Sequence, residues 1–313
     1  MSQNSKIEWT DHTFNPWWGC VKVSDGCREC YAETFSKRVG HNVWGPAATT
    51  PRRFFGDARW REPLRWNADA EKAGERARVF CASMADVFED HPEVGPHRER
   101  LFSLMAETLW LDWLLLTKRP ENIMRMVPES WQGGFPPNVW MGTSTEHQAA
   151  ADERIPHLLA VPAAVRFLSA EPLLGPIDLT KFQPFCRSLD GFRAARGILG
   201  GTVDWVIAGG ESGPKARPMH PDWARSLRDQ CISAGVAFHF KQWGEWAPTV
   251  VAPGGDLGGD LRRGHTRHLH GPGNPEGHFR KGDAYVSRVG KHNAGRELDG
   301  RTWDQFPNAA VPA

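Results

Sequence analysis

Short apolar runs that alternate with helical stretches constrain the fold of this chain more than any other feature. Each of six runs ends in polar residues, and they lie at residues 78–83, 113–116, 138–141, 165–168, 204–207 and 236–240. Helices are expected over residues 93–111, 121–126, 146–159 and 221–234. Strands that are apolar almost throughout are typical of a parallel sheet covered on both faces.

The alternation predicts an α/β fold, a partial TIM-like barrel of six or seven strand–helix units. The segment 14–33 is a candidate for a further, first strand. A closed eight-stranded barrel fits less well, because the sequence shows no eighth strand. A doubly wound sheet is the structural rival, but neither a Gly-x-Gly-x-x-Gly turn nor a P-loop supports it.

Polar side chains recur where these strands end. Functional groups of parallel barrels gather at the carboxyl ends of the strands. Ionisable groups on successive ends therefore predict a binding or catalytic site there. The polar residues at the strand ends are Ser83, Asp86, Thr117, Lys118, Arg119, Thr143, Ser144, Ser169, Glu171, Glu211, Lys241 and Gln242.

Three cysteines cluster ahead of this series. Cys20, Cys27 and Cys30 have the spacing C-x6-C-x2-C, and such a cluster of thiolates indicates a metal site. Six cysteines in 313 residues are too few and too unevenly placed for a disulfide scaffold. The other three, Cys81, Cys186 and Cys231, are expected to be ordinary buried thiols in a reducing compartment.

Two kinds of metal site fit three cysteines. Structural zinc needs a fourth ligand, and His12 and Cys81 are the nearest candidates in the sequence. A [4Fe–4S] cluster held by three cysteines leaves one iron open, to which S-adenosylmethionine (SAM) can bind. Both alternatives stay open on the spacing alone.

Two segments are less decisive. Residues 44–66 read as a loop that places Arg52, Arg53, Arg59, Arg61 and Arg65 beside aromatic residues, either to bind phosphates and bases or as a Trp-anchored surface. Residues 252–301 are rich in glycine and too polar for a core of their own, with a hairpin expected near 284–289. Within them His265, His268 and His270 could bind a metal, although a solvated surface tract is the favoured interpretation.

Bulk properties limit the class of protein. We expect a barrel domain over residues 1–250 and a Gly/His-rich extension over 251–313 that packs on it. Lys and Arg number 38 against 37 Asp and Glu, which excludes the global basic field of a nucleic-acid coat. No apolar run approaches ~20 residues, and the N-terminus lacks an apolar signal core, so a cytoplasmic protein without a membrane span is expected.

Several stretches carry a family resemblance: WWGCVKVSDGCRECYA (17–32), LLTKRP (115–120), LSAEPLLGPI (168–177), VIAGGESGPKARP (206–218), FKQWGEW (240–246) and VGKHNAGRELDGRTWDQFP (289–307). With them the chain resembles the phage Gp37/Gp68, or three-cysteine-motif, family, a divergent branch of the radical SAM superfamily. The common radical SAM spacing is C-x3-C-x2-C with an aromatic residue before the last cysteine. Here the first interval is six residues long, and Glu29 takes the aromatic position.

The resemblance implies that Cys20, Cys27 and Cys30 hold a [4Fe–4S] cluster and that SAM binds beside it. It also implies roles for the strand ends. Ser83 and Asp86 suit the methionyl amine, and Lys118 or Arg119 its carboxylate. Thr143, Ser144 and Glu171 suit the ribose hydroxyls, and the backbone of Gly209 and Gly210 suits adenine. Glu211, Lys241 and Trp243 are expected to face the substrate.

The function expected from this resemblance is repair or modification of a nucleic acid or nucleotide, as in the DNA-repair enzymes of the superfamily. An electron donor such as a flavodoxin or ferredoxin would serve the cluster. The alternative is a non-catalytic nucleic-acid-binding protein with a structural zinc or iron–sulfur site.

Overall fold

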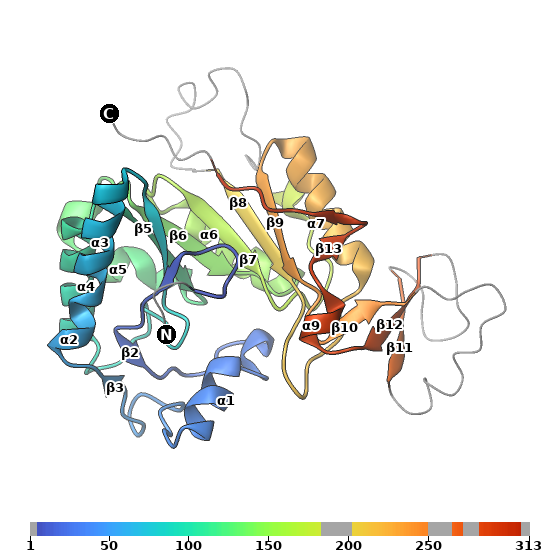
Figure 1. Ribbon diagram of the computed structural model, residues 1–313, viewed down its shortest axis with the longest axis horizontal. Coiled ribbons are helices and arrows are strands. Elements are labelled where there is room, and N and C mark those ends of the chain that lie inside the picture. Colours follow the sequence, from blue (N-terminus) through green and yellow to red (C-terminus); the bar gives the residue numbers. More distant parts are fainter. Residues whose placement is uncertain (1–4, 183–201, 250–264, 272–281, 308–313) are drawn as a thin grey trace.

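A parallel sheet of seven strands, curled into a half-barrel, organises the molecule (Figure 1). The computed structural model describes residues 5–182, 202–249, 265–271 and 282–307. The order in the sheet is β1-β4-β5-β6-β7-β8-β9, and every neighbouring pair is parallel. The strands are β1 (His12–Thr13), β4 (Ala77–Cys81), β5 (Leu111–Thr117), β6 (Val139–Ser144), β7 (Arg166–Ala170), β8 (Trp205–Gly209) and β9 (Ala237–Gln242).

The expected α/β partial barrel is thereby confirmed. All six apolar runs became strands, with bounds that differ by a few residues from those expected. The first strand of the sheet, β1, comes just before the cysteine segment rather than from within it. Within that segment, β2 (Trp17–Trp18) pairs instead with β3 (Arg53–Phe54) in a separate two-stranded sheet.

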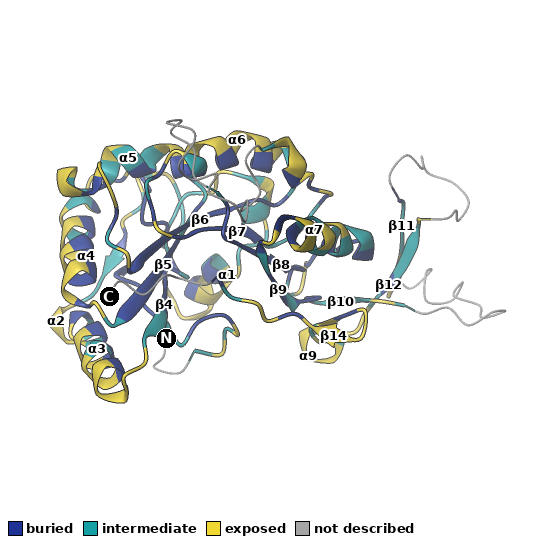
Figure 2. Ribbon diagram, turned by 90° about the horizontal axis from the view of Figure 1, so that it is seen from above, coloured by how far each residue is buried: buried dark blue, intermediate teal, exposed yellow. Residues whose placement is uncertain are grey.

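Helices cover the outer face of the half-barrel, and their outward sides are exposed (Figure 2). They are α3 (Glu62–Ala73), α4 (Gly95–Glu107), the short α5 (Ile123–Met126), α6 (Gln148–Leu159) and α7 (Pro221–Ala234). Local sequence sets the limits of α7: Pro221 occupies the first turn, where its missing N–H costs nothing, and Gly235 ends the helix in a left-handed conformation. The shorter α1 (Tyr31–Arg38) directly follows Cys30.

Alternating strand residues build two cores, one on each face of the sheet. Outward-facing residues such as Trp113 and Met141 pack against the covering helices in the larger cluster. Inward-facing residues such as Trp140, Phe167 and Trp205 form a second cluster with Trp9 from the N-terminal segment. Burial on both faces explains why the strands are apolar almost throughout.

The loop expected over residues 44–66 is found in the first part of the segment, since residues 45–52 form neither helix nor strand. The second part instead forms β3, the short helix α2 (Asp57–Trp60) and the start of α3. Pro63 lies in the first turn of α3, where proline favours a helix rather than breaking it. The side chains of Trp60 and Trp66 are buried in the core, and Arg52 is buried in an ion pair with Glu89. These contacts favour the structural interpretation of the segment.

A small antiparallel sheet lies beside the barrel (Figure 1). It is formed by β10 (Trp246–Pro248), β12 (Ala284–Arg288) and β11 (Thr266–Leu269), in the order β10-β12-β11. In place of the hairpin expected near 284–289 there is one strand, β12, which pairs with β10 and β11. Its small core joins Leu269 and Val286 of the segment 252–301 to Ala216 and Trp246, which lie outside that segment. Residues 250–264 and 272–281, which complete the Gly/His-rich extension, lie outside the described residues, as does Cys186.

The described chain end returns to the barrel through α9 (Lys291–Ala294), β13 (Glu297–Leu298) and β14 (Arg301–Thr302). The backbone N–H of Phe240 on β9 donates to the carbonyl of Trp303 over 2.9 Å. The split into domains at residue 250 stays a prediction. Within the described parts of the chain, we find no helix with the length and apolar character that a membrane crossing demands.

Candidate functional site

One cavity of about 740 Å³ opens at the carboxyl ends of the strands, and all three clustered cysteines line it. Hydroxyl, ammonium and carboxylate groups from several strand ends share the same wall. The N-terminal segment around Lys6 and Trp9 contributes as well. The predicted site residues among the lining are Cys20, Cys27, Cys30, Ser83, Asp86, Lys118, Ser144, Glu171, Gly210, Glu211 and Lys241.

Arg119 holds the chain around Cys20. Its Nη1 lies 3.7 Å from the Cys20 Sγ, and its Nη2 donates to the Val21 carbonyl over 2.8 Å. The Asp86 carboxylate, 2.7 Å from Nη1, orients the guanidinium. Burial raises the pKa of the Cys20 thiol to about 12, with Asp86 adding to the rise and Arg119 opposing it. A metal at this site would therefore displace a proton from the sulfur.

The other two cysteines flank a short turn before α1. Cys30 is the residue that precedes the helix, so the backbone N–H groups of Ala32 and Glu33 in the first turn lie near its sulfur. Burial raises the pKa of this thiol, and those two N–H groups act in the opposite direction. The Ser24 hydroxyl lies 3.8 Å from the Cys27 Sγ. Each sulfur is thus placed by contacts of its own.

A buried carboxylate anchors the long interval between Cys20 and Cys27. The Ser24 hydroxyl donates to Glu146 Oε1 over 2.9 Å, and Gly26 approaches the same side chain so closely that a Cβ there would overlap it. Arg154 of α6 fixes the other oxygen of Glu146 over 2.8 Å. Lys118 lies 3.4 Å from Oε1 and draws the pKa of Glu146 down together with Arg154, against the opposing effect of burial. Sequence reasoning missed this residue, although it follows the polar end of β6.

Both carboxylate oxygens of Asp86 accept hydrogen bonds from other residues of the protein. One carboxylate oxygen accepts hydrogen bonds from the Thr117 hydroxyl and the Phe88 N–H, and the other accepts from Arg119 and the Lys118 N–H. It therefore joins the end of β5 to the segment after β4. The neighbouring Ser83 hydroxyl accepts from Asn15.

Two further ion pairs lie at the ends of β7, β8 and β9. Lys241 Nζ lies 2.8 Å from both oxygens of Glu171, and Gln242 donates to Glu171 Oε1 over 3.1 Å. Glu211 binds the guanidinium of Arg217 through two hydrogen bonds of 2.8 and 2.6 Å. Gly210 lies so close to the Trp243 carbonyl that any side chain would overlap it, which is a structural reason for glycine there.

Four predicted site residues are not among the described residues that line the cavity: Arg119, Thr143, Gly209 and Trp243. Arg119 contacts the Cys20 sulfur but does not itself line the cavity. The Thr143 hydroxyl donates to the Thr117 carbonyl within the sheet. Trp243 is buried in the core and donates its indole N–H to the Glu297 carbonyl. The structure thus brings most of the predicted residues together and leaves these four outside the lining.

Comparison with known sequences places the chain in a family. Residues 4–307 match the family described as "Protein of unknown function (DUF5131)". The chain belongs to this family. No curated protein sequence matches it.

Two solved structures resemble this chain in fold. They are two mutants of spore photoproduct lyase, with TM-scores of 0.43 and 0.41 and sequence identities of 11% and 12%; the second contains a dinucleoside spore photoproduct. Each match covers 91% of this chain and 70% of the other. At such values the likeness assigns neither a cofactor nor a substrate.

The donor set of the DUF5131 chain suits an iron–sulfur cluster better than zinc. Tetrahedral zinc holds its sulfur ligands about 3.8 Å apart. The three cysteine sulfurs do not form a group whose atoms all lie within 4.8 Å of one another. The candidates for a fourth zinc ligand are also elsewhere: His12 stacks on Trp66, and Cys81 is buried in the core. A cube spreads its ligands over separate irons, so wider spacing and three cysteines both fit it.

Proposed function

We propose that this protein is a radical SAM enzyme in which Cys20, Cys27 and Cys30 hold a [4Fe–4S] cluster. The observation that carries the proposal is the cavity itself. All three cysteines line one space together with ammonium, hydroxyl and carboxylate groups from the strand ends of a half-barrel. When bound, a cluster with an open iron supplies the electron that cleaves SAM reductively.

The cavity walls provide groups suited to the parts of SAM. Lys118 presents an ammonium group near Ser144, 2.9 Å from its hydroxyl, and suits the methionyl carboxylate. Ser83 suits the amine. Glu171, held by Lys241, suits the ribose hydroxyls, and the backbone at Gly210 suits adenine. Glu211 lies further along the same wall and suits contact with the substrate.

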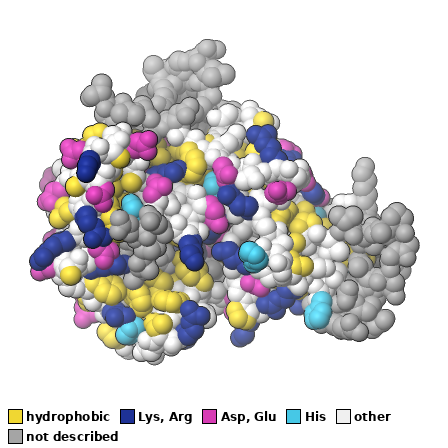
Figure 3. All heavy atoms as spheres, in the orientation of Figure 1, with side chains coloured by type: hydrophobic (Ala, Val, Ile, Leu, Met, Phe, Trp, Pro, Cys, Tyr) yellow, Lys and Arg dark blue, Asp and Glu magenta, His cyan; other side chains and the backbone are white. Residues whose placement is uncertain are grey.

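The remaining expectations belong to the same proposal. The substrate is a nucleic acid or a nucleotide, the electron donor is a flavodoxin or ferredoxin, and the protein works in the cytoplasm. The family corresponds to the phage Gp37/Gp68 proteins. Charges of both signs are interspersed over the face shown in Figure 3, which favours local contacts over tight non-specific binding of nucleic acid.

Anaerobic purification tests the cluster. We expect a brown protein with about four irons per chain that cleaves SAM under reduction. Cys27→Ala should lose both iron and cleavage, whereas Cys231→Ala, which removes a buried thiol of α7, should keep both. A colourless protein with one zinc would instead support the alternative, a nucleic-acid-binding protein with a structural metal. Full iron content in the Cys27 variant would refute the ligand assignment.

The substrate needs a separate measurement. Turnover of 5′-deuterated SAM with polynucleotides and free nucleotides, followed by mass spectrometry, shows which base or sugar acquires label. Label in a nucleic-acid component supports the proposed substrate class. SAM cleavage without any such transfer or product, across all of these substrates, would count against it while leaving the cluster assignment intact.

A further inference from the structure

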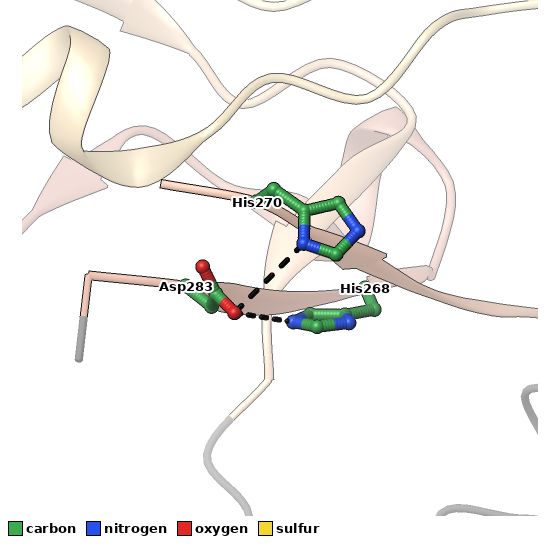
Figure 4. Close-up of side chains that lie close together, drawn as sticks. All are labelled: His268, His270 and Asp283. Carbon is green, nitrogen blue, oxygen red and sulfur yellow. Dashed lines mark hydrogen bonds and ion pairs between the residues drawn. The ribbon is translucent and has the colours of Figure 1, made fainter. Parts of the chain in front are cut away.

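A group of side chains that could hold a metal ion lies at the small antiparallel sheet (Figure 4). None of them lines the cysteine cavity. His268, His270 and Asp283 each point a donor atom to a common point between β11 and β12. These three atoms all lie within 4.8 Å of one another. Among the described residues this is the one group of three His, Cys, Asp or Glu donors that meets that distance.

Strand geometry brings the three side chains together. Residues two apart on a strand share a face, so His268 and His270 lie on the same side. The register pairs His268 with Tyr285 and Leu269 with Ala284, which places Asp283 opposite His270. The Asp283 side chain is fully buried, and the Gly271 N–H donates to its Oδ1 over 2.8 Å. That bond leaves Oδ2 directed at the two imidazoles.

The contacts with Asp283 do not give His270 a hydrogen-bond partner. His268 Nε2 lies 2.9 Å from Asp283 Oδ2, which is a hydrogen bond. His270 Nδ1 lies 3.9 Å from the same oxygen, is buried, and has no hydrogen-bond partner among the described residues. A buried ring nitrogen without a partner is costly, and a metal ion would satisfy it.

The distances suit ligands of one metal. Zinc binds imidazole nitrogen and carboxylate oxygen at roughly 2.0–2.2 Å. Two ligand atoms therefore lie about 3 to 4 Å apart when the ligand–zinc–ligand angle is a right angle or obtuse. The two measured separations, 2.9 and 3.9 Å, span that interval.

We propose that His268, His270 and Asp283 bind one Zn²⁺ ion and thereby fasten β11 to β12. Two imidazoles and a carboxylate form a donor set that zinc accepts readily, with a remaining position for water or another donor. The small core of this sheet, built around Trp246 and Val286, gives a physical reason for such a fastening. A bound metal is one of the links that stabilise small folded units with little apolar burial.

Zinc binding by the full-length chain tests the proposal. The three clustered cysteines are first replaced by serine, so that their thiolates do not compete. Competition with a chromophoric chelator should then show one tight Zn²⁺ site. His270→Ala and the isosteric Asp283→Asn should each weaken it at least about 100-fold, the upper end of what loss of an outer contact costs. His265→Ala is the matched control, because it removes an exposed histidine of the same segment that belongs to the other strand face.

Hydrogen exchange on the unmodified chain gives an independent readout. Zn²⁺ should slow amide exchange in β11 and β12, and a chelator should restore it. The proposal is overturned if zinc affinity is unchanged in the Asp283 variant, or if His265→Ala weakens binding as much as His270→Ala does. It is equally overturned if zinc leaves the exchange of both strands unchanged.

Discussion

Ser24 and Glu146 are 122 positions apart in the sequence, and the Ser24 hydroxyl donates to the Glu146 carboxylate over 2.9 Å. This contact connects the interval between the first two cysteines to the carboxyl end of β6. Arg154 holds the same carboxylate from α6, so the anchor is itself fixed. The six-residue interval between Cys20 and Cys27 is thus attached to the barrel through Ser24 and Glu146.

Glu146→Ala should reduce cluster loading. The substitution frees the segment around Ser24 and leaves Arg154 buried without its partner, which typically costs 3–5 kcal/mol in the free energy of unfolding. Outer contacts of metal sites contribute about 10–100-fold in affinity, so iron per folded chain should fall clearly below that of the unmodified protein. Iron and protein assays on the monomeric fraction provide the measurement.

Glu153→Ala is the control for this experiment, because Glu153 is an exposed carboxylate of α6, next to Arg154 in the sequence. Gly26→Ala should reproduce the iron loss, since its Cβ would overlap Glu146. Full iron occupancy in both the Glu146 and the Gly26 variants would show that the anchor does not position the cysteines.

Lys241→Met should weaken SAM binding. Lys241 contributes the two closest contacts to the Glu171 carboxylate, and hydrogen bonds to charged groups contribute about 1.5–3 kcal/mol. The dissociation constant, measured by equilibrium dialysis on iron-loaded protein, should rise by about tenfold or more. Lys291→Met removes a cation from the same cavity wall without disturbing Glu171 and should have a smaller effect. Equal losses in both variants would point to overall charge rather than to the Lys241–Glu171 pair.

His239 should make the fold less stable in mild acid. Burial lowers the pKa of this histidine to about 4, although Asp304, 3.8 Å away, acts in the opposite direction. In the unfolded chain the His239 imidazole takes up a proton near pH 6.5, whereas in the folded chain it stays neutral until the pH falls to about 4. The contribution of neutral His239 to the free energy of unfolding is therefore fully present above pH 6.5. It decreases by about 3 kcal/mol as the pH falls toward 4.

Urea unfolding at a series of pH values tests this prediction. His239→Phe should reduce the decline between pH 6.5 and 4, and comparing slopes removes any constant packing cost. His292→Phe, at an exposed position, should keep the original slope. An unchanged slope in the His239 variant would show that the imidazole does not stay neutral in the fold.

Arg52→Met should destabilise the protein without a specific loss of nucleic-acid binding. The guanidinium forms a fully buried ion pair with Glu89, 2.7 Å away, and removal of one partner from such a pair typically costs 3–5 kcal/mol. The exposed neighbour Arg61→Met should change the free energy of unfolding by no more than about 0.5 kcal/mol. If the Arg61 variant instead loses polynucleotide affinity at full stability, the segment has a binding role as well.

The period of the apolar residues sufficed to predict the barrel. All six apolar runs were found as strands because each is a short run that is buried on both faces, a pattern that depends little on distant residues. The helix α3 was missed because residues 44–66 were interpreted as a loop, whereas Pro63 lies in the first turn of the helix. A proline has opposite meanings at the start and in the middle of a helix, and only the position of the helix decides between them.

The candidate site, like the fold, was predicted from the sequence only in part. Ser83, Lys118, Glu171 and Lys241 were expected at one edge of the sheet, and the structure places them on one cavity. Trp243 was expected beside them, but its ring packs in the core and donates to the Glu297 carbonyl of β13. The return of the chain end to β9 creates that contact, and no pattern near Trp243 in the sequence indicates it.

Sequence alone determined the alternation of strands and helices and the clustering of three thiols near the start, because periodicity and clustering are local properties of a chain. Tertiary structure decided which polar strand ends face the cavity and which, such as Thr143, instead form hydrogen bonds within the sheet. It also decided that the interval after Cys20 docks on Glu146, and that His268 and His270 meet Asp283. Such pairs form between residues that only the folded backbone brings within a few ångströms, so their electrostatics cannot be read from spacing.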